Sequence, residues 1–409
     1  MRILLINHYA GSVEHGMEYR PFYLAREWVR LGHEVMVVAA SFTHLRSRAP
    51  SVVGTWTSEN IEGVRYVWVR TPSYRGNGLR RVLNMLVFIG RVLMDAGRIG
   101  GDFCPRVTIA SSTYPLDIVP AYRITKNSGG KLVFEVHDLW PLTAIELGGM
   151  SPRHPFIRVL QRAEDFAYRK ADGVVSLLAG AKGYMVERGM SPEKFAYIPN
   201  GIDPSEWEAG GGGIPDQHGE VLSRLKNESR FIVGYTGGHG VSNALSYFVE
   251  AAVHLHGFRV TLVLVGHGPE KDALIRRARD LGLANVVFLS PVRKTSIPSL
   301  LAEMDALYLG WQRKPIYRYG ISPNKILDYM MAGKVIVHAN AATNDPVAEC
   351  GCGISVPPED SRGIAAAIRE LMKCSREERE RMGRRGRQHV LLHHDYRRLA
   401  VDFLKVVGE

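Results

Sequence analysis

The segment 317–328 reads Tyr317-Arg-Tyr-Gly-Ile-Ser-Pro-Asn-Lys-Ile-Leu-Asp328 and joins a polar loop to the start of a helix. Ser322 suits a helix cap, and Pro323 suits the first helical position. The N–H groups of a first turn attract anions because they are unpaired and lie at the positive end of the helix dipole. Lys325 adds a full charge there, and Asp328 follows three residues later on the same side of the helix. This order suits a nucleoside diphosphate, whose phosphates would bind the helix start and whose ribose hydroxyls would bind the carboxylate.

An ordinary capped surface helix that carries a Lys/Asp pair would contain the same residues. The segment alone therefore leaves two interpretations open. If it binds a ligand, the binding residues are Ser322, Asn324, Lys325 and Asp328.

Short apolar runs alternate with segments of helical periodicity along the whole chain. In the first half the expected strands are Arg2–Tyr9, His33–Ser41, Val64–Val69, Val107–Ser112, Leu132–His137, Gly173–Leu178 and Phe195–Ile198. In the second half they are Phe231–Thr236, Val260–Gly266, Val286–Leu289, Ala306–Leu309, Val335–His338 and Gly353–Val356. Repeated strand–helix units rich in Val and Ile predict parallel sheets that helices cover on both faces.

The turn Pro199-Asn200-Gly201 separates the two series of strands. The sequence therefore predicts an α/β protein of two doubly wound domains, residues 1–200 and 201–387. A terminal helix within 388–409 is expected to pack back on the first domain. A simple terminal helix on the second domain is the alternative.

The composition is that of a globular protein, with 409 residues, 45% of them hydrophobic, and a net charge of +11. The charge calls for an anionic partner, but the chain shows neither an interleaved basic/aromatic stripe nor a nucleic-acid-binding module. Nucleic acid is therefore not expected, which leaves a membrane surface or a phosphorylated ligand. The four cysteines form no CxxC pair, and the N-terminus predicts a first strand instead of a secretion signal, so we expect a cytoplasmic protein.

Several motifs occur in a characteristic order. They are Gly32-His33-Glu34-Val35, His137-Asp138, the turn segment 198–203, Leu264-Val265-Gly266-His267-Gly268-Pro269, the segment 322–333 and Gly351-Cys352-Gly353-Ile354-Ser355-Val356. This order resembles glycosyltransferase family 4, which implies the GT-B fold of two Rossmann-like domains facing a cleft. The segments 16–20 and 319–325 resemble the branch that builds surface polysaccharides and is similar to N-acetyl-L-fucosamine transferases. The resemblance implies an acceptor-binding first domain and a nucleotide-sugar-binding second domain.

One position departs from the family. Family members usually carry two acidic residues eight positions apart, the first contacting the donor sugar and the second the ribose. Asp328 matches the second, whereas Gly320 stands at the first. The resemblance therefore carries over the ribose contact only, and it suggests a donor sugar without the hydroxyl that the missing carboxylate would bind.

The resemblance also implies roles in the first domain. His137 ends an expected strand, and the carboxyl ends of parallel strands face the ligand crevice. It would contact the donor sugar and orient it against the acceptor, with a buried structural histidine as the alternative. Gly11 would let a ligand approach the backbone. Glu18 and Arg20 begin the next helix and are candidates for contact with acceptor or phosphate, with plain capping as the alternative.

In the second domain, Gly237 and Gly238 follow the first strand, where glycine lets a pyrophosphate approach the N–H groups. Relatives grip the base through backbone atoms at the place of Val292 and Arg293. Arg293 or Lys294 is also a candidate cation beside Lys325, with a solvated basic turn as the alternative.

The chain contains neither an acidic DxD triplet nor a GxxxxGK[ST] loop. No metal and no cofactor are therefore expected, and positive side chains and helix amides would stabilise the leaving group. Residues 79–98 are apolar but carry four arginines against one acid. They could lie on an anionic membrane surface, with a core helix rimmed by arginines as the alternative.

These features predict a retaining, metal-independent glycosyltransferase. It would move an N-acetylhexosamine-type sugar, deoxy sugars included, from a UDP donor to a polyprenyl-diphosphate-linked saccharide. The expected pathways are O-antigen, capsule or exopolysaccharide assembly, at the inner face of the cell membrane. The alternatives are a GT-B sugar-nucleotide 2-epimerase and a non-catalytic nucleotide-sugar-binding partner of a synthase complex.

Overall fold

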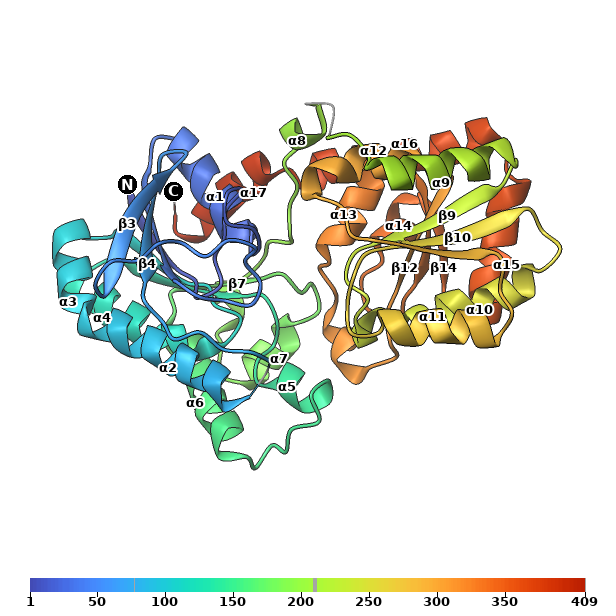
Figure 1. Cartoon of the computed structure of the whole chain (residues 1–409). Helices are drawn as coiled ribbons and strands as arrows, with labels where there is room; N and C mark the ends of the chain where they lie inside the picture. Colours follow the sequence, from blue (N-terminus) through green and yellow to red (C-terminus); the bar gives the residue numbers. More distant parts are fainter. Residues whose placement is uncertain (77, 209–211, 409) are drawn as a thin grey trace. The chain divides into compact units, whose positions relative to one another are not determined.

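The computed structural model describes residues 1–76, 78–208 and 212–408 (Figure 1). The chain divides into two compact units. The first unit comprises Met1–Asn200, Tyr319–Ser322 and Tyr396–Glu409, and the second comprises Gly201–Arg318 and Pro323–Asp395. Each unit is a doubly wound α/β layer structure, so the predicted fold class is confirmed.

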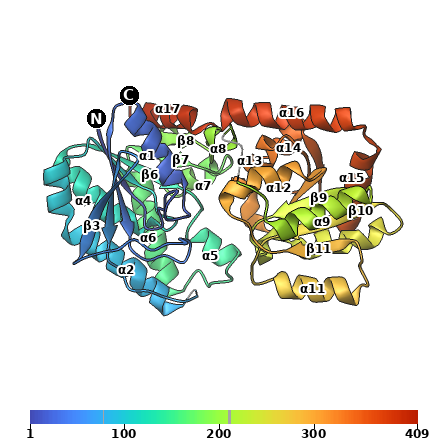
Figure 2. The ribbon, with the colours of Figure 1, turned by 45° about the horizontal axis from the view of Figure 1, so that its top comes forward.

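The first unit contains an eight-stranded sheet in the order β3-β4-β2-β1-β5-β6-β7-β8. The strands, in chain order, are β1 Arg2–Ile6, β2 Glu34–Ala40, β3 Trp56–Ile61, β4 Val64–Val69, β5 Val107–Ala110, β6 Lys131–Val136, β7 Gly173–Ser176 and β8 Phe195–Tyr197. The helices are α1 Arg20–Arg30, α2 Leu79–Met94, α3 Ala96–Arg98, α4 Ile118–Ser128, α5 Leu142–Glu146, α6 Pro155–Lys170, α7 Lys182–Glu187 and α17 Tyr396–Val406. Helices α1 and α17 cover one face of the sheet, while α2, α4 and α6 lie on the other (Figure 2).

The second unit contains a six-stranded parallel sheet in the order β11-β10-β9-β12-β13-β14. Its strands are β9 Phe231–Thr236, β10 Val260–Val265, β11 Val286–Leu289, β12 Ala306–Gly310, β13 Val335–Ala339 and β14 Gly353–Val356. Its helices are α8 Ser205–Glu208, α9 Asp216–Asn227, α10 Leu245–Ala251, α11 Lys271–Asp280, α12 Ile297–Ala302, α13 Asn324–Met331, α14 Pro346–Cys350, α15 Ser361–Lys373 and α16 Arg376–His393. Apolar side chains that alternate along the strands fill one core on each face of this sheet.

One strand of the first sheet was not predicted. β3 pairs antiparallel with β4, whereas the other neighbours in the sheet are parallel. Its sequence, Trp-Thr-Ser-Glu-Asn-Ile, lacks the apolar run of a buried strand because it lies at the sheet edge. Glu62 (φ 48°) and Gly63 (φ 83°) form the two-residue turn, and a pair of positive φ values is typical of such hairpins.

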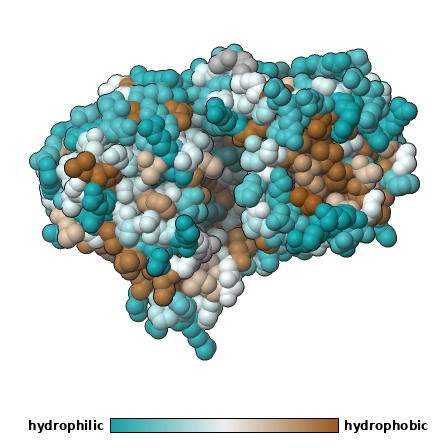
Figure 3. Space-filling model, in the orientation of Figure 1, coloured by the Kyte–Doolittle hydropathy of each residue, from teal (hydrophilic) through white to brown (hydrophobic). Residues whose placement is uncertain are grey.

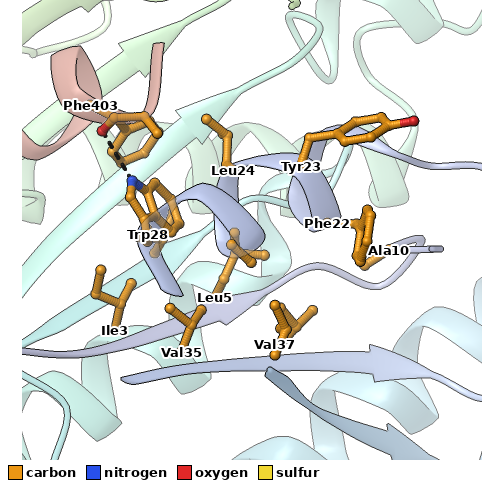
Figure 4. Packing of buried hydrophobic residues seen from close by; sticks show 14 of the residues in the cluster. Ile3, Leu5, Ala10, Phe22, Tyr23, Leu24, Trp28, Val35, Val37 and Phe403 are labelled. Carbon is orange, nitrogen blue, oxygen red and sulfur yellow. Dashed lines mark hydrogen bonds between the residues drawn. The ribbon is translucent and has the colours of Figure 1, made fainter. Parts of the chain in front are cut away.

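The C-terminal segment is shared between the two units. The stretch Pro323–Asp395 belongs to the second unit, and Tyr396–Glu409 belongs to the first. The segment that packs on the first unit is therefore shorter than the predicted 388–409. Trp28 of α1 donates from Nε1 to the Ala400 carbonyl oxygen (3.0 Å), and its ring meets Phe403 edge-on (Figure 4). The end of the chain thereby completes the core around its beginning.

Candidate functional site

Helix α13 begins at Asn324 in the second unit, one residue after Pro323, which is extended (φ −78°, ψ 132°). No side chain of the described residues caps this helix start. The prediction that Ser322 is the cap was therefore wrong. The Ser322 hydroxyl instead accepts a hydrogen bond from the Asn200 N–H (3.0 Å), and its carbonyl oxygen accepts one from the Asn200 side chain (2.6 Å). Ser322 belongs to the first unit. Because Ser322 does not cap α13, the N–H groups in the first turn of that helix remain available to bind an anion.

Lys325 lies in the first turn of α13 as a partly buried cation. Its Nζ donates to Asn243 Oδ1 (3.1 Å) and lies 5.3 Å from the centre of the Tyr235 ring. Within the described residues it makes no ion pair with a carboxylate. Burial lowers the pKa of Lys325 to about 8. A partly buried ammonium group whose described partners are a neutral amide and a ring is suited to receive an anion.

Gly237 and Gly238 follow β9 and lie beside this lysine. Gly237 has φ 134°, and an added Cβ would come within 2.3 Å of Lys325 Cε, so the lysine stem lies directly against the glycine. Gly238 is exposed, and its carbonyl oxygen accepts from the Tyr235 hydroxyl (2.6 Å) and the Asn243 amide (3.0 Å). Its N–H has no partner among the residues that the structure covers. The structure thus brings the predicted residues Gly237, Gly238 and Lys325 together with a free backbone donor.

Asp328 lies one turn further along α13. Burial raises the pKa of its carboxyl to about 7, while Lys294 acts in the opposite direction. The carboxyl makes no hydrogen bond within the described part of the chain, which leaves its oxygens available for hydroxyl groups. Lys294, by contrast, forms an ion pair with Glu206 (2.7 Å).

The loop after β11 carries the other residues predicted for this unit. Val292 is partly buried and packs against an apolar core, and Arg293 is exposed. The described structure shows no ion pair or hydrogen bond from the Arg293 side chain.

Gly320, where the family usually has an acid, has φ 102°, a conformation that disfavours side chains. An acidic side chain at this position would strain the backbone.

In the first unit, His137 follows β6 and is anchored through one ring nitrogen. Its Nε2 lies 3.1 Å from the Ser111 hydroxyl and 3.3 Å from Glu135 Oε2. Glu135 raises the pKa of His137 against the opposing effect of burial. No partner of Nδ1 occurs among the described residues, so His137 combines a fixed ring with one nitrogen open to a ligand.

Glu135 is a buried carboxylate that the sequence reasoning missed. Arg20 donates to it from Nε (3.0 Å) and Nη2 (2.9 Å), and together with His137 and Ser111 it lowers the pKa of Glu135 to about 2. Arg20 was a candidate for phosphate contact, but it is buried and committed to Glu135 and to the backbone at Ile198. A lone acid inside the apolar strand 131–136 was the signal that could have revealed this network.

Gly11 is buried, and its packing against neighbouring backbone explains why this position holds a glycine, with no need of a ligand. An added Cβ would come within 1.8 Å of the Gly16 carbonyl oxygen. Its N–H donates to Glu18 O (2.8 Å), and its carbonyl oxygen accepts from the Tyr66 hydroxyl (2.7 Å). The close approach predicted for a ligand is therefore made by the chain itself.

Helix α2 shows a hydrophobic face to solvent, and Figure 3 shows the hydrophobic colour on this part of the first unit. Leu79 is 87% exposed, and Leu83 and Leu86 are each 52% exposed. The opposite face, with Asn84, Met85, Phe88 and Val92, is buried.

Within residues 1–76, 78–208 and 212–408, no helix has the length and apolar character needed to cross a bilayer. The same residues bring together no group of three or more His, Cys, Asp or Glu side chains that could hold a metal ion.

Comparison with known proteins identifies the family. The model of the glycosyl transferase 4-like domain matches residues 15–201, and that of glycosyl transferases group 1 matches residues 230–374. The chain is similar to the putative colanic acid biosynthesis glycosyl transferase WcaI of Escherichia coli K12, with 24% identity over 85% of this chain and 86% of WcaI. It is 20% identical to the probable glycosyltransferase WbjE of Pseudomonas aeruginosa, over 90% of this chain and 89% of WbjE.

Among solved structures, Anabaena HepE in complex with UDP and glucose matches with a TM-score of 0.68 and 17% identity, and the match covers both chains fully. The protein belongs to glycosyltransferase family 4, has the GT-B fold and is a glycosyltransferase. The predicted family and fold are confirmed.

Proposed function

We propose that the protein transfers an N-acetylhexosamine-type sugar, deoxy sugars included, from a UDP donor to a polyprenyl-diphosphate-linked saccharide. The observation that carries the proposal is Lys325, a partly buried cation without a carboxylate partner in the described structure, beside the free Gly238 N–H and the uncapped start of α13. Likeness to HepE, whose structure contains UDP and glucose, supports a uridine nucleotide.

The proposed chemistry is stabilisation of the leaving diphosphate. Negative charge grows on the diphosphate as the glycosidic bond to the donor breaks. The Lys325 ammonium, the Gly238 N–H and the first-turn amides of α13 would meet that charge with little reorganisation. In this proposal no metal ion takes part and no side chain acts as a covalent nucleophile. The anomeric configuration is retained.

Asp328 would bind the ribose. Its carboxyl has no competing hydrogen bond among the described residues, and its raised pKa of about 7 makes it a carboxylate in a growing fraction as the pH rises above 7. A carboxylate accepts from both ribose hydroxyls, whereas the protonated form accepts less strongly. His137 would contact the sugar through its open nitrogen in the acceptor-binding first unit.

The lipid acceptor would be reached at a membrane surface. The exposed Leu79, Leu83 and Leu86 could enter the headgroup region, and the exposed Arg80 would lie at the rim of this face. The similarity to WcaI, named for colanic acid biosynthesis, supports surface polysaccharide assembly at the inner face of the cell membrane.

The test is transfer from a panel of labelled UDP-, GDP- and ADP-sugars to bacterial lipid extract, with product analysis by thin-layer chromatography and NMR. We expect a lipid-linked product from one or more UDP-sugars, formed with retention and in the presence of EDTA. Lys325→Met should lower turnover roughly 100-fold or more, which is the usual effect of removing a group that stabilises transition-state charge.

Lys226→Met is the control, because Lys226 is an exposed lysine of the same unit paired with Glu303. Its turnover should equal that of the parent. Turnover from GDP- or ADP-sugars alone would contradict the uridine assignment. Binding without turnover would indicate a sensor, and interconversion of free UDP-sugars would indicate an epimerase.

A further inference from the structure

Two thiols stand on either side of a single glycine in the second unit. Cys350 is the last residue of α14, and Cys352 directly precedes β14. Gly351 between them has φ 63°, the left-handed conformation that ends a helix in a tight turn. Across such a turn, Cα atoms two residues apart are separated by about 5–6 Å, within the ~4.4–6.8 Å that disulfides span. The spacing and the glycine therefore allow a bond between the two sulfurs.

The two thiols differ in exposure and share a hydrogen bond. Cys350 is partly exposed, whereas Cys352 is fully buried in an apolar core. The Cys352 thiol donates to the Cys350 sulfur, and this hydrogen bond lowers the pKa of Cys350 and raises that of Cys352. Arg385 of α16 also lowers the pKa of Cys350, and its Nε donates to the Gly351 carbonyl oxygen (3.0 Å). The accessible sulfur is thus the one that ionises more readily, and the thiolate is the nucleophilic form.

The buried sulfur fills a seam between two helices. A Cβ added to Gly386 of α16 would lie 3.2 Å from Cys352 Sγ and 3.6 Å from the Cα atom of Met330 in α13. Cys352 therefore packs where α16 and α13 meet, and α13 is the helix that carries Lys325. A change at this sulfur would reach α13, because close-packed side chains lose contacts when a neighbouring atom is withdrawn.

We propose that Cys350 and Cys352 form a redox-active dithiol, in which a peroxide oxidises Cys350 and Cys352 converts the product to a disulfide. In the first step the Cys350 thiolate attacks one oxygen of hydrogen peroxide. An S–O bond forms, the O–O bond breaks, and the departing hydroxide takes up the proton that Cys350 released, which gives water and a sulfenic acid. In the second step the Cys352 sulfur attacks the Cys350 sulfur, the S–O bond breaks, and hydroxide leaves as water with the Cys352 proton. The peroxide is reduced to two water molecules while the two thiols are oxidised to one disulfide.

The disulfide would alter the packing of α13. Bonded sulfurs lie about 2.05 Å apart, closer than two thiols that share a hydrogen bond. Closing the bond moves Cys352 Sγ toward Cys350 and withdraws it from the seam beside Gly386 and Met330. The inference goes beyond the proposed function and does not depend on it, because the reaction uses neither a nucleotide nor a sugar.

The test uses the full chain, reduced with dithiothreitol, freed of the reductant and treated with one equivalent of hydrogen peroxide at pH 7. Trypsin cleaves after Lys334 and Arg362, so both thiols fall in the peptide 335–362, which contains neither Cys104 nor Cys374. We expect this peptide to lose the mass of two hydrogens and to regain it on reduction. A peptide 335–362 that keeps its mass would overturn the proposal.

Two variants separate the roles of the thiols. Cys352→Ala should stop the reaction at the sulfenic acid, which dimedone then labels at Cys350. Cys350→Ser should leave Cys352 unmodified, because Cys352 is buried. Cys374→Ser is the matched control, since Cys374 is a partly exposed thiol of the same unit, and it should leave the disulfide yield unchanged. Dimedone labelling of the exposed Cys104 in preference to Cys350 would show that exposure alone governs oxidation, and the proposal would be wrong.

Hydrogen exchange measures the effect on α13. Exchange in residues 324–331 should be roughly threefold to tenfold faster in the oxidised parent than in the reduced parent, because local opening becomes easier. The same peroxide treatment should leave exchange in Cys350→Ser unchanged. A disulfide that formed without any change in the exchange of α13 would contradict the assigned packing role of Cys352. Disulfide formation in a protein without UDP-sugar turnover would remove the proposed function and leave the dithiol.

Discussion

Lys325 carries a positive charge into a partly buried position, and its partners among the described residues, Asn243 and Tyr235, are neutral. Its folded-state pKa, about 8, lies below the ordinary lysine value of 10.5, so the unfolded chain holds this proton more tightly than the folded one. Between these two values the free energy of unfolding therefore rises with pH. The charge costs stability in the free protein, and in the proposed function this cost would be offset when a diphosphate binds.

Lys325→Met should consequently stabilise the unliganded protein at pH 7, by about 1–3 kcal/mol, while it abolishes UDP binding. The rise in stability between pH 8 and 10.5 should also become smaller. Urea unfolding of parent and variant at pH 7 and 10 measures both effects. Lys226→Met should change stability by less than about 1 kcal/mol, because exposed ion pairs contribute little. A Lys325→Met protein less stable than the parent would contradict this account of the site.

Gly237 and Gly238 offer a matched pair of substitutions. Gly237→Ala places a Cβ 2.3 Å from Lys325 Cε at φ 134°, so either the lysine or the loop must move. We expect a loss of about 2–4 kcal/mol in stability and at least tenfold in UDP affinity. Gly238→Ala meets its nearest atom at 4.0 Å and should stay close to the parent in stability. Thermal unfolding with and without UDP distinguishes the two, and equal behaviour would show that the Lys325 stem does not need Gly237.

At the scale of elements, the Arg20–Glu135 pair joins α1 to β6 inside the first unit. Glu135→Gln leaves the buried guanidinium without its carboxylate and should cost about 3–5 kcal/mol at pH 7. The pKa of Glu135 is lowered from 4.5 to about 2, so its stabilisation is complete above pH 4.5 and is lost as the pH falls through 2.

The stability difference between parent and Glu135→Gln should therefore narrow on acidification from pH 5 to pH 2.5. Chemical unfolding at several pH values measures this narrowing. Glu59→Gln is a suitable control, because Glu59 lies partly exposed in the edge strand β3. A difference that stayed constant with pH would show that Glu135 is not ionised in the folded protein.

Helix α2 is the element expected to bind membranes. Leu83→Glu should reduce sedimentation with phosphatidylglycerol vesicles at least tenfold, because it places a negative charge on the face assigned to the headgroup region. Leu31→Glu changes an equally exposed leucine (49%) after α1 and should have little effect. Equal losses in the two variants would show that the reduction reflects net charge instead of the α2 face.

At the scale of the whole molecule, the core of the first unit depends on the last helix of the chain. Phe403 is 1% exposed and contacts Trp28, so Phe403→Ala should destabilise the first unit by about 3–5 kcal/mol. Val401→Ala, at an exposed position of the same helix, is the control.

Hydrogen exchange resolved along the chain should show faster exchange in β1 and α1 of the Phe403→Ala variant. Exchange in β9 and β10 should stay unchanged, because these strands belong to the second unit. Similar acceleration in both units would mean that they unfold as one.

Much of this architecture followed from local patterns. The strand and helix series, the family and the helix start at residues 323–324 were predicted because buried parallel strands and glycine-punctuated loops leave strong local signals. The edge strand β3 was missed because an edge strand lacks the apolar run. Ser322 was misassigned because a hydroxyl before a helix looks like a cap unless its distant partner, Asn200, is known.

Sequence by itself determined the kind of protein. It also predicted that Lys325, Gly237 and Gly238 meet a diphosphate, because these residues lie in motifs whose chemistry is local. Tertiary structure alone decided that Lys325 is partly buried beside Asn243, with no carboxylate partner among the described residues, and that Glu135 holds Arg20 and His137. It also decided that the final helix completes the first core. Burial and charge pairing arise between residues far apart in the chain, where no local pattern records them.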